Sequence, residues 1–347
     1  MKKNLILIAI SLAIFSNAQI INFTDPNFKT ILLSITSSPG PNVAKDLNGN
    51  TIKLDANNNG EIEISEAQNV SFLDIYGQTY PTKISDANEL KYFTNLTYLR
   101  FTYHNITTVD LSQLTKLTDA FLHNNQISSI NTVGALALTQ INCSYNNLQS
   151  LNVSSNINLQ SLICEFNQLS NLTIGNLSNL WAVYLKNNNL TNLDFSKTNL
   201  QSLHCDNNQL VSLNIQNNFN MSSSTSAFTA TNNPNLTTVC ADTNEVNWVQ
   251  AYFQNQGNST VSVSVCSLST NEVNESNLIY IENPVNNYFR YSSKENVKKI
   301  ELYTIDGKLV NSGLKNNSLV SKLSSGIYFT KIYFQSGKIL TKKLMKN

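Results

Sequence analysis

The sequence predicts a mainly β protein that starts as a solenoid of stacked parallel strands and ends in a small antiparallel β-sandwich. Three observations predict this fold class. The middle of the chain repeats one apolar pattern about every 21 residues. The last part, about 70 residues long, alternates apolar and polar residues between turn signals. Short non-repeat segments flank the repeats and can cap them, as a stack of coils requires at its ends.

Residues 1–18 predict a secretory signal peptide. Lys2 and Lys3 form a positive start, Leu5 to Phe15 form a short apolar stretch, and Ser16-Asn17-Ala18 supplies small residues before a cleavage site. A membrane anchor is the alternative, but the apolar stretch is too short to span a bilayer comfortably. No later stretch is long and apolar enough to span. We therefore expect a mature chain that is exported and either soluble or attached to the cell surface.

Residues 19–69 predict an N-terminal cap. The segment "DPNFKTILLSI" predicts a short amphipathic helix that Asp25-Pro26 opens. Further on, "DANNNGEIEISE" has the spacing of a calcium loop, with acid or amide groups at positions 1, 3 and 5, glycine at 6 and glutamate at 12. The predicted Ca²⁺ ligands are the side chains of Asp55, Asn57, Asn59 and Glu66 and the carbonyl of Glu61, with Glu63 acting through water.

The calcium-like loop differs from a sensor of the EF-hand type on its entering side. The preceding stretch "VAKDLNGNTIKL" predicts a turn and a strand, so the entering helix that would move is missing. Two asparagine ligands also lower the charge of the site, which favours weak affinity suited to extracellular calcium. We expect bound calcium to rigidify the cap.

Residues 70–239 hold the repeats. Their clear copies are "LTYLRFTYHNI" at 96, "LTDAFLHNNQI" at 117, "LTQINCSYNNL" at 138, "LQSLICEFNQL" at 159, "LWAVYLKNNNL" at 180 and "LQSLHCDNNQL" at 200. This resembles the leucine-rich repeat, L-x-x-L-x-L-x-x-N-x-L. "VSFLDIYG" at 70 and "FTATNNPNL" at 228 are interpreted as irregular first and last copies. The two inward columns are Leu99, Ala120, Ile141, Leu162, Val183, Leu203 and Phe101, Leu122, Cys143, Cys164, Leu185, Cys205.

An asparagine follows the strand of nearly every copy. A buried carboxamide there can satisfy backbone groups that the bend would leave unpaired. The first clear copy has His104 instead, which we interpret as a structural substitute. The predicted asparagine column is Asn125, Asn146, Asn167, Asn188 and Asn208.

Residues 240–266 predict a C-terminal cap with a helix around Trp248. Cys240 and Cys266 lie at its two ends, and in an exported protein they predict a disulfide. A bridge between Cys143 and Cys164 is the competing interpretation. It receives less weight because leucine fills the same column in other copies. Residues 267–277 predict a polar linker.

Residues 278–347 predict a small antiparallel β-sandwich, with turns at Asp306-Gly307 and Ser336-Gly337. The segments "ENPVNNYF", "IELYTIDGKLV", "LSSGIYFTKI" and "TKKLMKN" resemble the type A C-terminal sorting domain of type IX secretion cargo in Bacteroidetes. Many members have Tyr-Pro-Asn-Pro where this chain has Ile281-Glu282-Asn283-Pro284. The resemblance implies that this domain engages the type IX machinery, carries the chain to the outer surface and is usually removed. The body likewise resembles leucine-rich-repeat proteins that precede such tails.

Charge is unevenly distributed along the chain. Residues 19–272 hold 9 Lys and Arg against 17 Asp and Glu, whereas residues 273–347 hold 12 against 5. The overall formal charge of +1 does not suggest a nucleic-acid-binding protein.

The predicted function is protein binding or adhesion through the concave face of the solenoid. Aromatic and charged side chains recur there on adjacent strands, which is typical of a binding surface. A polysaccharide-binding accessory protein is the alternative, and a secreted enzyme is a less favoured one. No catalytic motif appears, and His204 with Asp206 lacks a nucleophile. The predicted binding residues are Tyr98, Arg100, Tyr103, Phe121, Tyr145, Phe166, Trp181 and Tyr184.

Overall fold

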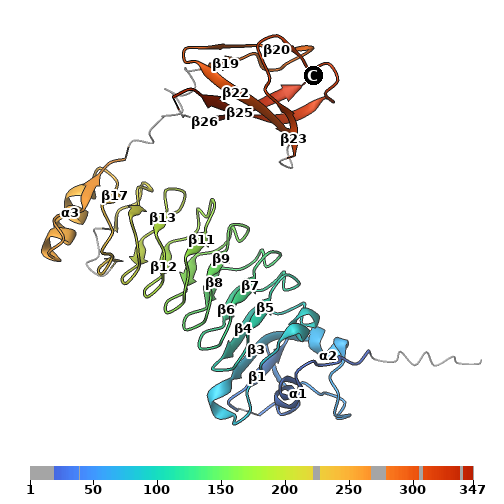
Figure 1. The fold of residues 1–347 in the computed structure, drawn as a ribbon. Helices are drawn as coiled ribbons and strands as arrows, with labels where there is room; N and C mark the ends of the chain where they lie inside the picture. The colour runs from blue at the N-terminus through green and yellow to red at the C-terminus, as the bar shows by residue number, and fades with distance from the viewer. Residues whose placement is uncertain are drawn as a thin grey trace, which may run out of the picture. The chain divides into compact units, whose positions relative to one another are not determined.

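The computed structural model describes residues 19–38, 40–221, 227–266, 279–304, 308–336 and 339–346. The predicted signal peptide and linker lie outside these ranges. The chain divides into two compact units between Val265 and Cys266, a repeat unit and a tail unit (Figure 1).

The N-terminal cap contains helix α1, Pro26–Leu33, which begins as predicted: Asp25 accepts a hydrogen bond from the Asn27 N–H at 2.8 Å. Strands β1, Val43–Asp46, and β2, Thr51–Ile52, form a hairpin, and β1 pairs antiparallel with β3, Val70–Tyr76. The five-residue helix α2, Ile64–Gln68, leads into β3. Two 3-10 helices, Gly77–Thr79 and Asn88–Tyr92, connect β3 to the first regular coil.

The main sheet contains ten strands in the order β16-β14-β12-β10-β8-β6-β4-β3-β1-β2. From β3 onward all neighbours are parallel, and each of the coils from β4 to β16 contributes one strand. These strands are β4 Tyr98–Thr102, β6 Asp119–Phe121, β8 Gln140–Asn142, β10 Ser161–Ile163, β12 Ala182–Tyr184, β14 Ser202–His204 and β16 Phe228–Thr229.

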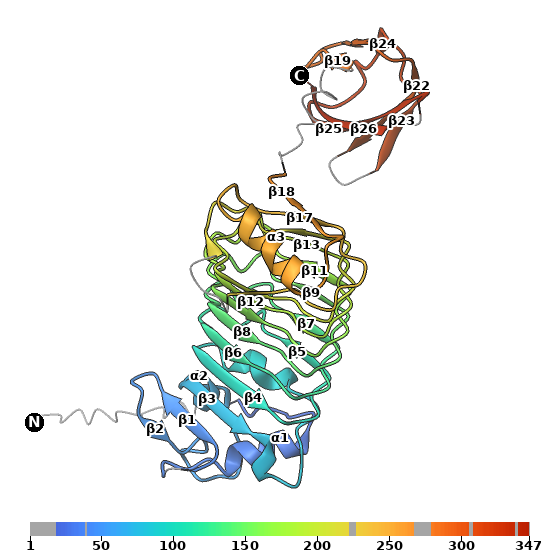
Figure 2. The same cartoon turned by 90° about the vertical axis from the view of Figure 1, so that its left-hand side faces the viewer.

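Short strands also line the opposite side of the coils (Figure 2). They form three separate parallel ladders, β5-β7, β9-β11 and β13-β15-β17-β18. Their bounds are β5 Thr108–Asp110, β7 Ser129–Asn131, β9 Ser150–Asn152, β11 Asn171–Thr173, β13 Asn192–Asp194, β15 Ser212–Asn214, β17 Thr238–Cys240 and β18 Ser262–Ser264.

The interior of the stack confirms the predicted columns. All twelve side chains of the two inward columns have 0% exposure. Because one coil cannot bury its own apolar face, this core exists only through stacking. The helix α3, Val246–Asn255, closes the far end, where Tyr252 and Phe253 contact the Phe228 ring.

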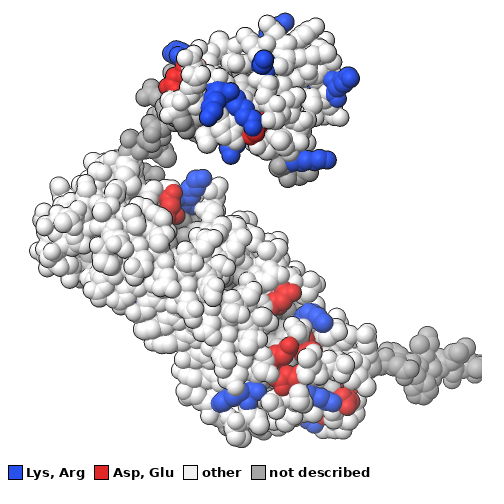
Figure 3. Space-filling model, in the orientation of Figure 1, with Lys and Arg blue, Asp and Glu red and all other residues white. Residues whose placement is uncertain are grey.

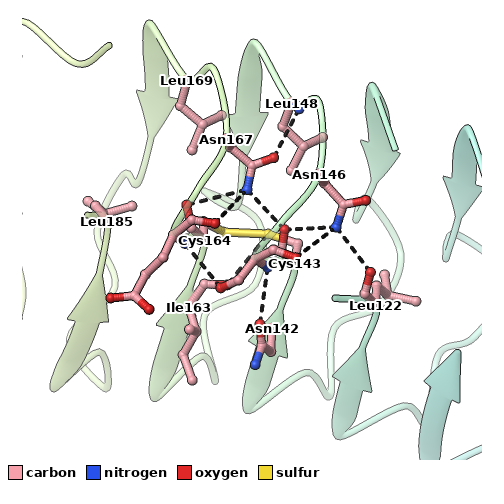
Figure 4. Close-up of a disulfide and its surroundings, with 12 residues drawn as sticks. Leu122, Asn142, Cys143, Asn146, Leu148, Ile163, Cys164, Asn167, Leu169 and Leu185 are labelled. Carbon is pink, nitrogen blue, oxygen red and sulfur yellow. Dashed lines mark hydrogen bonds between the residues drawn. A yellow bond between two sulfur atoms is a disulfide. The ribbon is translucent and has the colours of Figure 1, made fainter. Parts of the chain in front are cut away.

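The asparagine column also has its predicted role, shown for two members in Figure 4. The Asn146 carboxamide donates to the carbonyls of Leu122 and Cys143, at 3.1 and 2.9 Å, and its oxygen accepts from the Ile127 N–H at 2.9 Å. Each amide therefore ties its own strand end to the preceding coil. Asn125, Asn167, Asn188 and Asn208 repeat this pattern, as does Asn233, which was not among the predicted members.

The cysteine interpretation needs one correction. Cys143 and Cys164 form a disulfide between neighbouring coils, with Cα atoms 4.9 Å apart (Figure 4). The smaller weight given to this pair was wrong, because equivalent Cα atoms on adjacent strands lie about 4.8 Å apart, within disulfide range. Cys240 and Cys266 are both disulfide-bonded, whereas Cys205 is free, and a bond between Cys240 and Cys266 stays a prediction.

The tail unit is antiparallel, as predicted. One sheet has the order β23-β22-β25-β26, and two strand pairs, β19-β21 and β20-β24, complete the unit. Ile300, Leu302, Ile332, Phe334 and Leu344 lie in its core. The strands are β19 Ile279–Ile281, β20 Tyr288–Phe289, β21 Tyr291–Ser293, β22 Val297–Thr304, β23 Leu309–Ser312, β24 Ser318–Leu319, β25 Gly326–Phe334 and β26 Ile339–Lys346.

Candidate binding face and cation loop

The outward side chains of the main sheet lie in rows that cross the strands. Because side chains alternate along a strand, residues in register share one face. One row runs Phe72, Tyr98, Asp119, Gln140, Ser161, Ala182, Ser202, and the next runs Asp74, Arg100, Phe121, Asn142, Ile163, Tyr184, His204, Thr229. We call this surface the sheet face. It holds most of the residues that the repeat pattern predicts for the concave surface.

An aromatic group covers the N-terminal end of the sheet face. The rings of Phe72 and Tyr98 stack with centroids 4.3 Å apart, and Phe121 lies 5.4 Å from Tyr98. The Lys45 ammonium lies over the Phe72 ring at 4.8 Å. The predicted residues Tyr98 and Phe121 are therefore brought together.

An ion pair lies beside this aromatic group. Arg100 donates to Asp74 at 2.6 Å and lies over the Tyr76 ring. Burial raises the pKa of Asp74, although the Arg100 charge opposes that shift. Tyr103 contacts Tyr76 and His123 edge-on, with centroids 5.3 and 5.7 Å away.

Three predicted aromatic residues have an unusual backbone. Tyr103, Tyr145 and Phe166 each follow a strand, just before the column position, with φ of 62°, 54° and 53°. This left-handed conformation disfavours bulky residues and suits asparagine. The other coils place asparagine there, namely Asn124, Asn187, Asn207 and Asn232.

The rings at two of these turns are also exposed. Tyr145 and Phe166 are 49% and 42% exposed and stack with centroids 4.3 Å apart. At the next turns, the Asn207 carboxamide donates to the Asn187 oxygen at 2.9 Å, and Asn232 donates to Asn207 at 2.7 Å. An aromatic pair thus continues into an amide ladder along this edge of the sheet face.

The C-terminal end of the sheet face carries a polar group. Tyr184 stacks on His204, whose Nδ1 lies 3.0 Å from the Thr229 hydroxyl. Asp206 accepts hydrogen bonds from Thr229 and Thr231. It also pairs with Lys186 at 3.3 Å.

Trp181 is outside the strand register that defines the rows of the sheet face. It precedes β12 and occupies the column of Thr118, Thr139 and Gln160, whose backbones link successive coils. Its side chain is exposed, so Trp181 remains a predicted binding residue.

The cation loop brings its predicted residues close together. The side-chain oxygens of Asp55 and Asn57 both accept from the Asn59 N–H, at 3.1 and 3.0 Å. Gly60 has φ of 78°, as the turn at loop position 6 requires. Ile62, between the ligand positions, is buried, and its carbonyl accepts from the Ile21 N–H.

Glu66, the predicted twelfth-position ligand, has partners of its own. Its oxygens accept from the N–H groups of Ala56 and Glu63 at 2.7 and 3.0 Å, the second bond being half of a capping box. Burial raises the pKa of Glu66, and the neighbouring Glu63 carboxylate adds to this shift. The Glu61 carboxylate pairs with Lys29 at 2.6 Å. In the described part of the chain, no three His, Cys, Asp or Glu side chains form a group that could hold a metal.

Residues of the first coil were missed as members of the sheet face. Phe72, Asp74 and Tyr76 alternate along "VSFLDIYG" and were recognisable by this period of two. The coil that follows them is longer than the others: in register, Phe72 pairs with Tyr98, which lies 26 positions later in the chain. The 21-residue period therefore did not include them.

The comparisons with known proteins identify the tail. Residues 279–347 match the family of the secretion system C-terminal sorting domain. The chain carries a sorting domain of this kind. No curated protein matches the chain. The chain is also similar to a solved structure, the functional domain of InlJ from Listeria monocytogenes, which includes a cysteine ladder. That likeness has 14% identity and a TM-score of 0.30, over 82% of this chain and 83% of the other.

The sorting domain directs the chain to the cell surface or the outside through type IX secretion. The body ahead of it is a solenoid of the leucine-rich-repeat kind, as its coils and asparagine column show. Within the ranges that the structure describes, no helix has the length and apolar character needed to cross a membrane.

Proposed function

We propose that the protein is a secreted or surface-displayed binding protein, and that the sheet face and its aromatic edge bind a protein ligand. The observation that carries the proposal is the backbone of Tyr103, Tyr145 and Phe166. At this turn other coils use asparagine, which tolerates a left-handed backbone at smaller cost. Strain of this kind, about 1 kcal/mol or more per residue, is typical of functional positions.

Several features of the surface support a protein ligand. Charged side chains are sparse over the middle coils in the view of Figure 3, and these coils hold the exposed aromatic residues Tyr145, Phe166 and Trp181. Aromatic residues are enriched in the centres of protein interfaces. Stacking within the Tyr145–Phe166 pair covers one face of each ring, which leaves less open ring surface for a sugar. A polysaccharide ligand is therefore the second candidate.

Replacing both Tyr145 and Phe166 with asparagine is expected to weaken ligand binding at least tenfold while leaving the fold intact. Asparagine is the residue that other coils place at this turn. Relief of the left-handed strain and loss of the ring stack should nearly cancel, changing stability by no more than about 1 kcal/mol. Binding is measured against a panel of purified proteins and soluble polysaccharides, and stability by urea unfolding.

The matched control is Asn187→Tyr, which adds an aromatic ring at the same turn of another coil. It is expected to lower stability without reducing binding. The proposal is wrong if the double asparagine variant binds every ligand of the wild type with unchanged affinity. A ligand set made only of polysaccharides would favour the second candidate.

We further propose that the loop at residues 55–66 binds Ca²⁺ and stiffens the N-terminal cap. The clustered oxygens of Asp55 and Asn57 support this proposal, together with Asn59 and the turn at Gly60. Glu66 would have to exchange its bonds to Ala56 and Glu63 for the ion. The loop lies against the Gln19–Ile21 segment, so fixing it would fix the start of the mature chain.

Calcium titration of the chain without its leader is expected to show a single weak site by calorimetry. At free calcium ten times the dissociation constant, binding should stabilise the repeat unit by about 1.4 kcal/mol. A variant with Asp55→Asn and Glu66→Gln should lose this effect, whereas Asp46→Asn, in the neighbouring hairpin, should retain it. The absence of both binding heat and a shift in Tm for the wild type would rule out the site.

A further inference from the structure

The outer face of the four-stranded tail sheet is rich in large exposed side chains. The register places Leu309, Tyr303, Phe329 and Lys343 in one row across β23, β22, β25 and β26. On one side of this row lie a row of Glu301, Lys331 and Thr341 and, beyond it, a row of Lys299, Tyr333 and Ile339. On its other side lie Ile327 and Met345. We call this surface the tail face.

The apolar residues of the tail face are unusually open to solvent. Leu309, Ile327, Ile339 and Met345 are 47%, 40%, 52% and 42% exposed. The opposite side of the same strands carries the buried core, including Ile300, Ile332 and Phe334. Large exposed apolar side chains that gather on one face mark a surface for association.

The charge of the tail face is positive. Its rows hold three lysines, Lys299, Lys331 and Lys343, and among these described residues no arginine and a single acidic residue, Glu301. Figure 3 shows the same imbalance on the visible side of this unit, with many basic and few acidic side chains.

The charge of the Glu301 carboxylate is compensated by its neighbours on the tail face. Glu301 pairs with Lys299 at 2.5 Å and accepts from the hydroxyls of Tyr303 and Tyr333, at 2.7 and 2.8 Å. These contacts lower the pKa of Glu301 to about 2. The Lys299 and Lys331 ammonium groups lie 6.0 and 5.6 Å from the Tyr333 ring centre. Among the residues that the structure describes, no carboxylate forms an ion pair with Lys331 or Lys343.

We propose that the tail face docks on a membrane surface that carries anionic lipid headgroups. Lysine is depleted in protein interfaces and arginine is enriched there, whereas this surface has only lysine. Lysine stems can lie along an apolar surface while the ammonium groups reach the headgroups. A sheet face that alternates aliphatic, aromatic and lysine side chains therefore fits the boundary between headgroups and acyl chains. The sorting domain would then be held at a membrane during export.

The test uses the full chain after its leader, with vesicles of equimolar phosphatidylcholine and phosphatidylglycerol or of phosphatidylcholine alone. Co-sedimentation is expected only with the anionic vesicles and should weaken as salt is raised. Each lysine near an anionic surface contributes about fivefold in affinity. The double variant Lys331→Glu and Lys343→Glu should therefore lose at least tenfold.

Two further double variants distinguish binding through the tail face from a nonspecific effect of net charge. The pair Lys315→Glu and Lys322→Glu changes net charge equally, in the loops on either side of β24, and should lose less than threefold. The pair Ile339→Ser and Met345→Ser should weaken binding without changing charge. Circular dichroism and thermal unfolding verify that each variant is folded.

The proposal is overturned if the wild type does not bind the anionic vesicles, or if the two charge variants weaken binding equally. It is also overturned if the Lys331/Lys343 variant binds vesicles normally but is not exported by cells that have the secretion machinery. In that case the tail face would dock on a protein.

Discussion

Replacing Asn188 with alanine is expected to lower the free energy of unfolding of the repeat unit by about 3–4 kcal/mol. The Asn188 carboxamide donates to the carbonyls of Cys164 and Leu185, at 2.8 and 3.1 Å, and its oxygen accepts from the Leu169 N–H at 2.9 Å. Alanine would leave these buried backbone groups without partners, and each costs about 1 kcal/mol or more. The loss is measured by urea unfolding followed by circular dichroism.

The run Asn187-Asn188-Asn189 supplies its own controls. Asn189 is exposed, so Asn189→Ala is expected to change stability by less than about 0.5 kcal/mol. Asn187 has φ of 57° and accepts from Asn207, so Asn187→Ala should cost about 1 kcal/mol. Equal effects of the three substitutions would show that the buried amide column does not hold the coils together.

The contribution of His104 to stability is expected to fall by about 3 kcal/mol as the pH is lowered from 7.5 to 4. Burial lowers the pKa of His104 to about 4, and the nearby Lys83 charge acts in the same direction. In the unfolded chain this pKa lies near 6.5. Between these two values the unfolded state binds more protons than the folded state. The contribution of His104 to the free energy of unfolding is therefore fully present above the unfolded pKa. It decreases as the pH is lowered through this window.

The variant His104→Asn isolates this effect from other acid-labile groups. His104 occupies the asparagine column, and its Nδ1 accepts from the Ile84 N–H at 3.2 Å, as an amide oxygen could. Urea unfolding of both proteins at pH 7.5, 6 and 4.5 gives the difference in stability. This difference should shift in favour of the variant by about 2–3 kcal/mol towards acid pH. A difference that stays constant with pH would contradict the assignment of a neutral buried imidazole.

Much of the candidate site was predictable because it follows from periodicity. The apolar columns, the asparagine column and the alternation of outward side chains such as Tyr98 and Arg100 come from a strand period of two within a coil of about 21 residues. Periodicity does not assign Trp181 to a face, because it lies one residue before β12. The first residue of a strand determines which side chains point to each face. In a three-residue strand such as β12, the residues next to the strand therefore cannot be assigned to a face from the repeat pattern.

The sequence by itself determined the solenoid, its caps and the sorting domain, because these features rest on local patterns that any stack of coils must satisfy. Tertiary structure alone decided which side chains meet. It brought Cys143 to Cys164, stacked Tyr145 on Phe166 and placed Lys299 beside Tyr333. Such contacts depend on the register between strands and on the backbone at each turn. They arise only when separate coils or strands lie side by side.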